Sequence, residues 1–288
     1  MNLLLSALML CSASFAGNLG CHSVHDQQHC EILSIDCATA NRALSPDLQS
    51  VFSRCARQDS CEISRIGISF CHFNRARFSS LAALLARHKT TVQSVSLESC
   101  LFFHRLDMSS LALSQLVSLK HLHISGTDLS TTDIMHLCTP LPAGLEILRI
   151  ERQDMSFGSD ASYLALILQG LDNLRVLELV DAHIPAKHCL SLLRVVFRMR
   201  ALSKLDLSGN QIGAVLLQKL AEHEPAWEEL DISNNQIDWT THAAHLKNVL
   251  RARNLKRLSI GRCPAAAAKE VQEAAGMLQL IRHDPAPS

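Results

Sequence analysis

A short pattern of apolar and polar positions recurs along most of the chain. Each copy has an apolar residue, two variable residues, a second apolar residue, one variable residue, a third apolar residue, two variable residues and a closing small or amide residue. Eight copies of this phrase lie between Ile63 and Cys263, and a degenerate copy starts at Cys30. The clearest copies read LSKLDLSGN at 202–210 and WEELDISNN at 227–235. The alternation inside the phrase predicts a β-strand with one buried face.

Helices are predicted between the strands. The phrase recurs about every 27 residues, which leaves room for a helix after each strand. Apolar residues recur at spacings of three and four in the intervening segments. These segments are 80–89, 161–170, 186–199, 213–223 and 241–252. Ser130 and Asp133 have the spacing of a capping box at a helix start. Parallel strands lie closer together than packed helices, so the stack is expected to curve, with the sheet concave and the helices convex.

The phrase resembles the LxxLxLxxN repeat of the leucine-rich-repeat superfamily. Cysteine closes the copies at Cys71, Cys100 and Cys263, as is common in the ribonuclease-inhibitor-like class. The resemblance implies an α/β fold, a curved leucine-rich-repeat solenoid with a parallel sheet on its concave face and helices on its convex face. It also implies a protein that binds its partner along the concave sheet. Gln153 and Ala182 replace the usual closing Asn or Cys, so a less regular middle is expected.

The two ends divide the chain further. Residues 1–16 are interpreted as a signal peptide, because an apolar run precedes Ser14-Phe15-Ala16, a signal-peptidase pattern. A cytosolic first helix and a lipid anchor at Cys21 are alternatives. Residues 17–62 are expected to form a cysteine-rich cap with a degenerate first repeat, 63–263 the repeats, and 264–288 a capping helix (265–280) and tail.

The cysteines of the amino-terminal cap are candidates for disulfide bonds, which favour an oxidising compartment. Buried reduced thiols are the alternative interpretation. The candidates are Cys21, Cys30, Cys37, Cys55 and Cys61.

Composition excludes several classes of function. Lys plus Arg and Asp plus Glu are both 27, and no long basic run is present, which argues against nucleic-acid binding. No apolar stretch reaches the ~20 residues of a transmembrane helix. The chain has no Ser-hydrolase, phosphate-loop or dinucleotide motif, so we predict no catalytic residues and no cofactor. The histidines on the predicted helices, such as His88 and His188, are interpreted as surface or edge residues.

The variable positions of the phrase are predicted to point onto the concave face. Ile147, Val176 and Val180 would form an exposed apolar patch, which often marks a binding site. Glu178, Asp206 and Asp231 would form an acidic stripe suited to a cationic or peptide partner. Other candidates for partner binding are Arg149, His121 and His123.

Three further interpretations stay open. His121 and His123, with Glu98 and Glu151 on neighbouring strands, offer ligands of the type zinc takes, although we predict no metal site. The leading function is an exported, non-catalytic protein- or peptide-binding module. The alternative is a cytosolic or host-delivered adaptor, since 44–55 faintly resembles an F-box opening. Self-association through the edges of the sheet is also possible.

Overall fold

The computed structural model describes residues 32–36, 52–53, 55, 62–103, 106–111, 113–155, 162–222, 227–238, 242, 245, 249, 254–261 and 279–281. Its described part is an α/β fold around one large parallel sheet, which confirms the predicted fold class at that level. The ten strands of this sheet lie side by side in chain order. They are β1 (Ile32–Asp36), β2 (Arg65–Ser69), β4 (Ser94–Glu98), β6 (His121–Ser125), β7 (Ile147–Glu151), β8 (Val176–Val180), β9 (Lys204–Asp206), β10 (Glu229–Asp231), β11 (Arg257–Ser259) and β12 (Gln279–Ile281).

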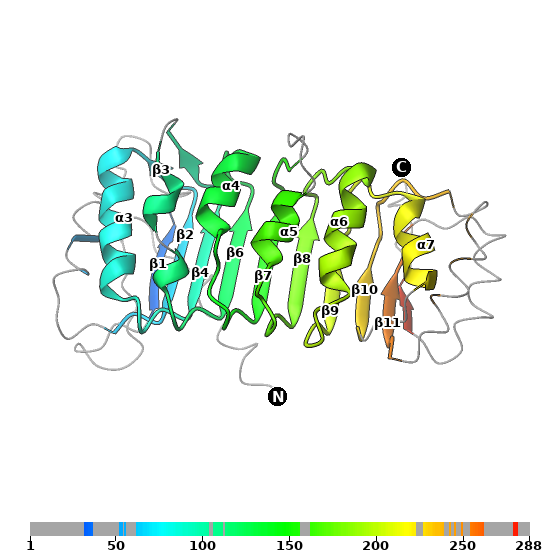
Figure 1. Ribbon diagram of the computed structural model, residues 1–288. Helices are drawn as coiled ribbons and strands as arrows, with labels where there is room; N and C mark the ends of the chain where they lie inside the picture. Colours follow the sequence, from blue (N-terminus) through cyan, green and yellow to red (C-terminus); the bar gives the residue numbers. More distant parts are fainter. Residues whose placement is uncertain are drawn as a thin grey trace.

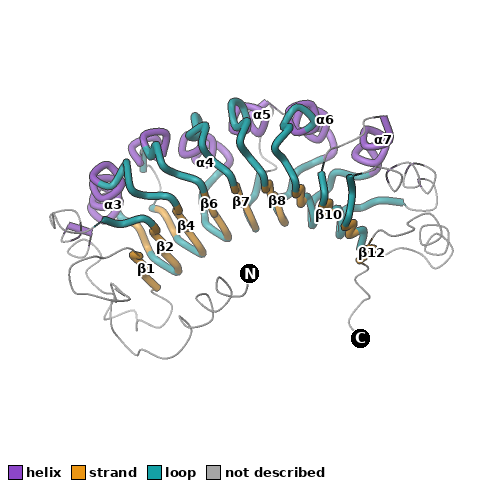
Figure 2. The backbone as a smooth tube through the Cα atoms, turned by 90° about the horizontal axis from the view of Figure 1, so that it is seen from below, coloured by secondary structure: helices purple, strands orange, loops and turns teal. Residues whose placement is uncertain are grey.

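The described helices cover one face of this sheet. They are α3 (Arg75–Arg87), α4 (Thr131–Cys138), α5 (Ser162–Leu168), α6 (Ala186–Val196) and α7 (Ala214–Glu222), with 3-10 turns at Met108–Leu111 and Leu113–Gln115. Figure 1 shows them in a row in front of the strands. Figure 2 shows an arc with the strands along its inner side and the helices along its outer side. The described part therefore curves as the spacing argument predicts.

The strands pair without any shift in register, because each presents the same phrase position to its neighbours. The central leucines and isoleucines, such as Leu148, Leu177 and Leu205, point into the core and are fully buried. One outward row is Arg65, Ser94, His121, Ile147, Val176, Lys204, Glu229 and Arg257. The next outward row is Gly67, Ser96, His123, Arg149, Glu178, Asp206, Asp231 and Ser259. Both rows match the sequence prediction.

In the large sheet, each strand from β2 to β10 is followed by a tight turn at the same phrase position. The residue before the closing position has a positive φ, which favours glycine but is occupied mostly by other residues. These residues are Phe70, Ser99, Gly126, Arg152, Asp181, Gly209 and Asn234. The turn directs the closing residue into the core, where Asn210 and Asn235 are buried. Cys71 and Cys100 are buried at the same position.

The middle of the sheet is as regular as the rest, which corrects the expectation drawn from Gln153 and Ala182. Strands β7 and β8 pair over five residues. The longer Gln153 side chain is buried and reaches the preceding turn. With its oxygen facing that turn, it accepts hydrogen bonds from the N–H groups of Gly126 at 2.9 Å and Thr127 at 2.6 Å. The glutamine therefore still links its turn to the preceding one, although through other backbone groups than Asn210 uses.

The helix starts follow from local capping. Ser130 and Asp133 form the predicted capping box at the start of α4. Helix α3 begins at Arg75, earlier than the predicted 80, because the Asn74 side chain accepts from the Arg77 N–H. The terminal helix predicted over 265–280 is wrong at its end, since Gln279 and Leu280 belong to β12 and pair with β11.

Several predictions lie wholly or partly outside the described residues. These include the signal peptide at 1–16 and four of the disulfide candidates, Cys21, Cys30, Cys37 and Cys61. Cys55 is described and buried. A disulfide bond of Cys55 stays a prediction, because the other candidate cysteines of the cap lie outside the described residues. Among the described residues, no helix is long and apolar enough to span a membrane.

Two helical histidines are not at the surface, contrary to the sequence interpretation. His88, at the end of α3, is 4% exposed, and its Nε2 lies 3.4 Å from the carbonyl oxygen of Cys55. Burial lowers the pKa of His88 and so favours its neutral form. His188, in α6, is also buried. Both histidines are therefore part of the buried interior instead of facing solvent.

Candidate functional site

The candidate site is the face of the sheet opposite the helices. No described helix covers this face, and its side chains come from the outward rows of the strands (Figure 2). Purely parallel sheets are usually covered on both faces. The uncovered face is therefore the most distinctive surface of the described part, and we call it the concave face.

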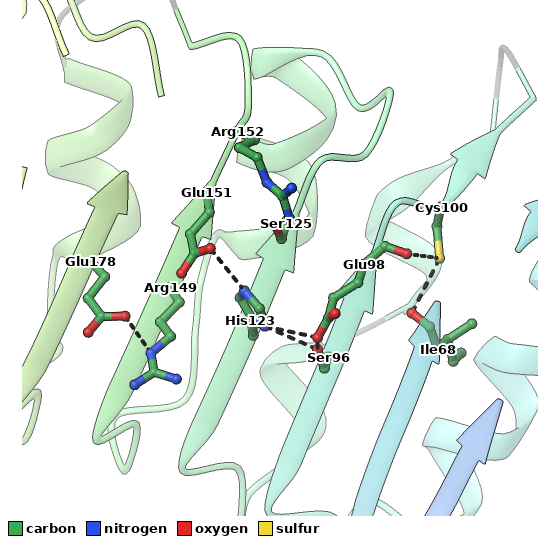
Figure 3. Close-up of polar contacts among 10 residues, drawn as sticks. All are labelled: Ile68, Ser96, Glu98, Cys100, His123, Ser125, Arg149, Glu151, Arg152 and Glu178. Carbon is green, nitrogen blue, oxygen red and sulfur yellow. Dashed lines mark hydrogen bonds and ion pairs between the residues drawn. The ribbon is translucent and has the colours of Figure 1, made fainter. Parts of the chain in front are cut away.

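His123 is the centre of a polar cluster on β4, β6 and β7. Its Nδ1 lies 3.2 Å from the Ser96 hydroxyl oxygen and 3.3 Å from Oε1 of Glu98. Its Nε2 lies 3.7 Å from Oε2 of Glu151. Ser96 also donates to Glu98 at 2.8 Å. Figure 3 shows the imidazole between the two carboxylates, but among the described residues only its Nδ1 has a hydrogen-bond partner, because Nε2 is buried without one.

A second cluster links the next three strands through one carboxylate. Glu178 on β8 lies 2.5 Å from Nε of Arg149 and 2.5 Å from Nζ of Lys204. The Glu178 residue is only 6% exposed, whereas both cationic side chains reach solvent. Glu178 is therefore neutralised by its own neighbours. The predicted acidic stripe is shorter than expected, because Glu178 does not offer a free charge to a partner.

The other two members of the stripe, Asp206 and Asp231, face each other across β9 and β10. Asp206 accepts from the N–H of Ser208 at 3.0 Å and its hydroxyl at 2.7 Å, and Asp231 accepts from the N–H of Ser233 at 2.9 Å. Within the described part of the chain, neither aspartate forms an ion pair. Burial, with a contribution from Asp231, raises the pKa of Asp206 above its usual value.

The substitution Asp206→Asn is expected to stabilise the fold. A raised pKa means that the folded chain holds the proton more tightly, so stability falls as the pH rises from the unfolded-state value of 3.8 through the folded-state pKa. The neutral amide of asparagine removes this loss of stability, and its oxygen still accepts the hydrogen bonds from Ser208. We expect a gain of about 0.2–1 kcal/mol at pH 7, typical of relieving one cross-strand pair of like charges.

Thermal unfolding of both proteins from pH 3 to pH 8 measures this difference. The gain should correspond to a melting temperature about 1–3 °C higher at neutral pH, and it should disappear below the unfolded-state pKa. Asp172→Asn, which makes the same charge change at an exposed turn, is the control and should be neutral. A destabilised Asp206→Asn protein at pH 7 would contradict the argument.

The three predicted apolar residues are brought together but are less exposed than expected. Ile147 and Val176 are direct neighbours on β7 and β8, and Val180 lies beside Glu151. All three are half-buried. Ile147 and Val176 form a short apolar strip in the row next to Arg149 and Glu178, whereas Val180 lies on the other side of Glu178, so the three do not form one open patch. Their role in binding stays a prediction.

The sequence analysis missed an apolar surface at the carboxyl ends of the first strands. Phe70, Leu101 and Phe103 are among the most exposed large apolar side chains of the described residues. Leu101 lies on β5 (Leu101–Phe102), which pairs with β3 (His72–Phe73) as a separate two-stranded sheet. The sequence signal for this surface is the alternation from Leu101 to Phe103, which falls outside the repeated phrase.

The cluster around His123 contains groups used in metal binding and in acid–base chemistry. No group of three His, Cys, Asp or Glu side chains suited to a metal ion occurs in the described part of the chain. His121 is exposed, and the partial burial of its ring lowers its pKa.

Strand β4 pairs on both sides, so the backbone N–H groups around Ser96 are engaged in the sheet. These N–H groups are therefore not available to stabilise an oxyanion at Ser96.

The buried cysteines of the helices are poorly suited to chemistry. Burial raises the pKa of Cys138 and of Cys189 to about 12, so both stay protonated thiols near neutral pH. They serve as small apolar side chains of the core.

Comparison with known proteins adds no assignment. No model of a known protein family matches this chain, and no curated protein matches it. The fold and the concave face are therefore the basis of a functional proposal.

Proposed function

We propose that this chain is a leucine-rich-repeat solenoid of the ribonuclease-inhibitor-like class that binds a protein or peptide on its concave face. The repeated phrase and the in-register parallel strands support the solenoid. The observation that carries the function is the face of the parallel sheet that no described helix covers, since solenoids of this kind bind partners on their extended concave surfaces.

The side chains on this face favour binding of a polar partner. His123 is hydrogen-bonded to Ser96 through Nδ1, and Glu178 is ion-paired with Arg149 and Lys204, so these side chains are already oriented before a partner arrives. Such preorganisation reduces the entropy lost on association. The apolar strip of Ile147 and Val176, beside the Glu178 cluster, would supply the desolvated centre that interfaces need.

The proposed role is non-catalytic. The only hydroxyl, imidazole and carboxylate set described on this face is Ser96, His123 and Glu151, and the Ser96 proton is donated to Glu98 instead. The helix cysteines are protonated thiols of the core. Neither observation favours a reaction over binding.

Site-specific photo-crosslinking tests the proposal. A photoreactive amino acid is placed either at Ser94, on the concave face, or at exposed Ala83, on the opposite side in α3. In native cells, we expect a discrete adduct from position 94 and none from position 83. The adduct should decrease at least fivefold when Val176→Lys is added, because a lysine beside Lys204 disturbs the apolar strip. Adducts from position 83 alone, or equal adducts from both, would overturn the proposal.

We also propose that the protein is exported, with a disulfide-bonded amino-terminal cap. This rests on the apolar start, Ala16 and the cysteines of residues 17–62. The alternative is a cytosolic or host-delivered adaptor. The intact mass of the native protein distinguishes them, since loss of residues 1–16 supports export and an intact Met1 supports the alternative.

A further inference from the structure

The carboxyl-terminal part of the concave face holds a group of acceptors that lack a cationic partner. Asp206, Asp231 and Ser259 occupy the same phrase position on β9, β10 and β11 and are direct neighbours in the sheet. In-register parallel strands lie about 4.8 Å apart, so the three side chains emerge side by side from one face.

The charge of this group is not balanced by the chain itself. The nearest cations in the adjoining row are Lys204 and Arg257, and each is committed to a glutamate, Lys204 to Glu178 and Arg257 to Glu229. Among the described residues, no cation lies within ion-pair distance of Asp206 or Asp231. Two neighbouring carboxylates without a counter-charge are unfavourable in the unbound protein.

Ser259 provides an independent observation that points to a ligand. It is only 5% exposed, and its hydroxyl oxygen has no hydrogen-bond partner in the described structure. Buried hydroxyls are nearly always satisfied, because an unsatisfied one loses its hydrogen bonds to water without compensation. Ser259 lies directly beside Asp231, on the same face. A donor arriving over the acid pair would satisfy it.

The number and kind of acceptors select the ligand. Asp206 and Asp231 each use Oδ1 for a backbone N–H, which leaves Oδ2 of each, and Ser259 adds its hydroxyl oxygen. Three acceptors match the three N–H donors of a primary ammonium group. Calcium requires six to eight oxygen ligands, more than this group offers. The planar guanidinium of arginine matches two acceptors in one plane better than three on neighbouring strands.

We propose that Asp206, Asp231 and Ser259 bind the ammonium group of a lysine side chain on the protein partner. This inference rests on the proposed function and adds the chemistry of one contact. Asp206 and Asp231 are half-buried and still reach solvent, so the lysine enters over the carboxylates. Its single charge then offsets the repulsion between the two carboxylates, and its remaining donor reaches Ser259.

Fluorescence anisotropy of a dye-labelled tetralysine peptide with the full chain tests the site. We expect saturable binding at low salt, weakened at least tenfold by Asp206→Asn and by Asp231→Asn. Ser259→Ala should weaken it about threefold. The asparagines keep the acceptors for Ser208 and Ser233, so the fold is preserved, which circular dichroism verifies. Asp172→Asn is the matched control and should stay within twofold.

Other outcomes overturn the inference. Equal weakening by Asp172→Asn and Asp231→Asn would mean general charge attraction. Equal binding of an acetyl-lysine peptide would exclude the ammonium group. Tighter binding of tetra-arginine, or displacement by calcium below 1 mM, would assign the site to another cation.

The crosslink at position 94 separates this inference from the proposed function. If Asp206→Asn and Asp231→Asn leave both the adduct and the peptide affinity unchanged, the lysine site is wrong and concave-face binding stands. If tetralysine binds as expected but position 94 gives no adduct, the ammonium site stands and the proposed function fails.

Discussion

Asn210→Ala is expected to lower the free energy of unfolding by about 3–5 kcal/mol, because several buried backbone groups lose their partner at once. The Asn210 amide donates to the carbonyls of Leu179 (2.6 Å), Leu207 (2.9 Å) and Ser208 (3.1 Å). Its oxygen accepts from the N–H of Ile184 at 3.0 Å. Alanine makes none of these bonds, and the side chain is too deeply buried for water to replace them.

Urea unfolding followed by circular dichroism measures this loss. Asn173→Ala is the matched control, because Asn173 is exposed and donates one hydrogen bond, to the carbonyl of Ala143 at 3.0 Å. We expect the control to change the free energy by less than about 1 kcal/mol, since water replaces a bond at the surface. If both variants lost a similar unfolding free energy, the buried hydrogen bonds of Asn210 would not stabilise the two successive turns that they join.

The strand positions could be predicted from the sequence because one short pattern determines several levels of structure. In a strand, alternation decides which side chains are buried, and the equal position of Leu205 and Leu230 in their phrases decides the register. The outward rows follow directly. This is why His123, Arg149 and Asp206 were correctly placed on one face before their contacts were known.

The contacts between the outward side chains could not be predicted in the same way. Lys204 reaches Glu178 diagonally from the neighbouring row, and this depends on how a long flexible side chain lies on the surface. The acidic stripe was therefore overestimated. The exposure of Ile147 and Val176 depends equally on what lies over them, which alternation does not specify.

Local sequence preference also failed where distant pairing decides the structure. The alanine-rich segment before Gln279 favours a helix, yet 279–281 is a strand because it pairs with β11. Gln153 was expected to disrupt its turn, but its longer side chain still reaches the N–H groups of Gly126 and Thr127. Both errors arise from contacts with the preceding strand or turn.

Glu178→Ala is expected to lower the free energy of unfolding by about 2–3 kcal/mol, since one buried carboxylate serves two cations. Its removal leaves Arg149 and Lys204 without their partner and with nothing to offset their mutual repulsion. The cost stays below that of a fully buried pair, because both cations reach solvent. Urea unfolding at low and high salt measures it, and the loss should decrease as salt screens the repulsion.

The control for this prediction is Glu228→Ala, which removes an exposed carboxylate 2.8 Å from Nζ of Lys256. Exposed pairs contribute about 0–1 kcal/mol, so the control should have little effect. Equal losses of unfolding free energy in the two variants would mean that burial of Glu178 does not strengthen its ion pairs. A larger loss in Glu178→Ala, together with weaker crosslinking from position 94, would show that this carboxylate acts on binding by orienting Arg149 and Lys204. Since Glu178 itself is covered, a partner would contact the two cations, and the acid that holds them determines where their charges lie.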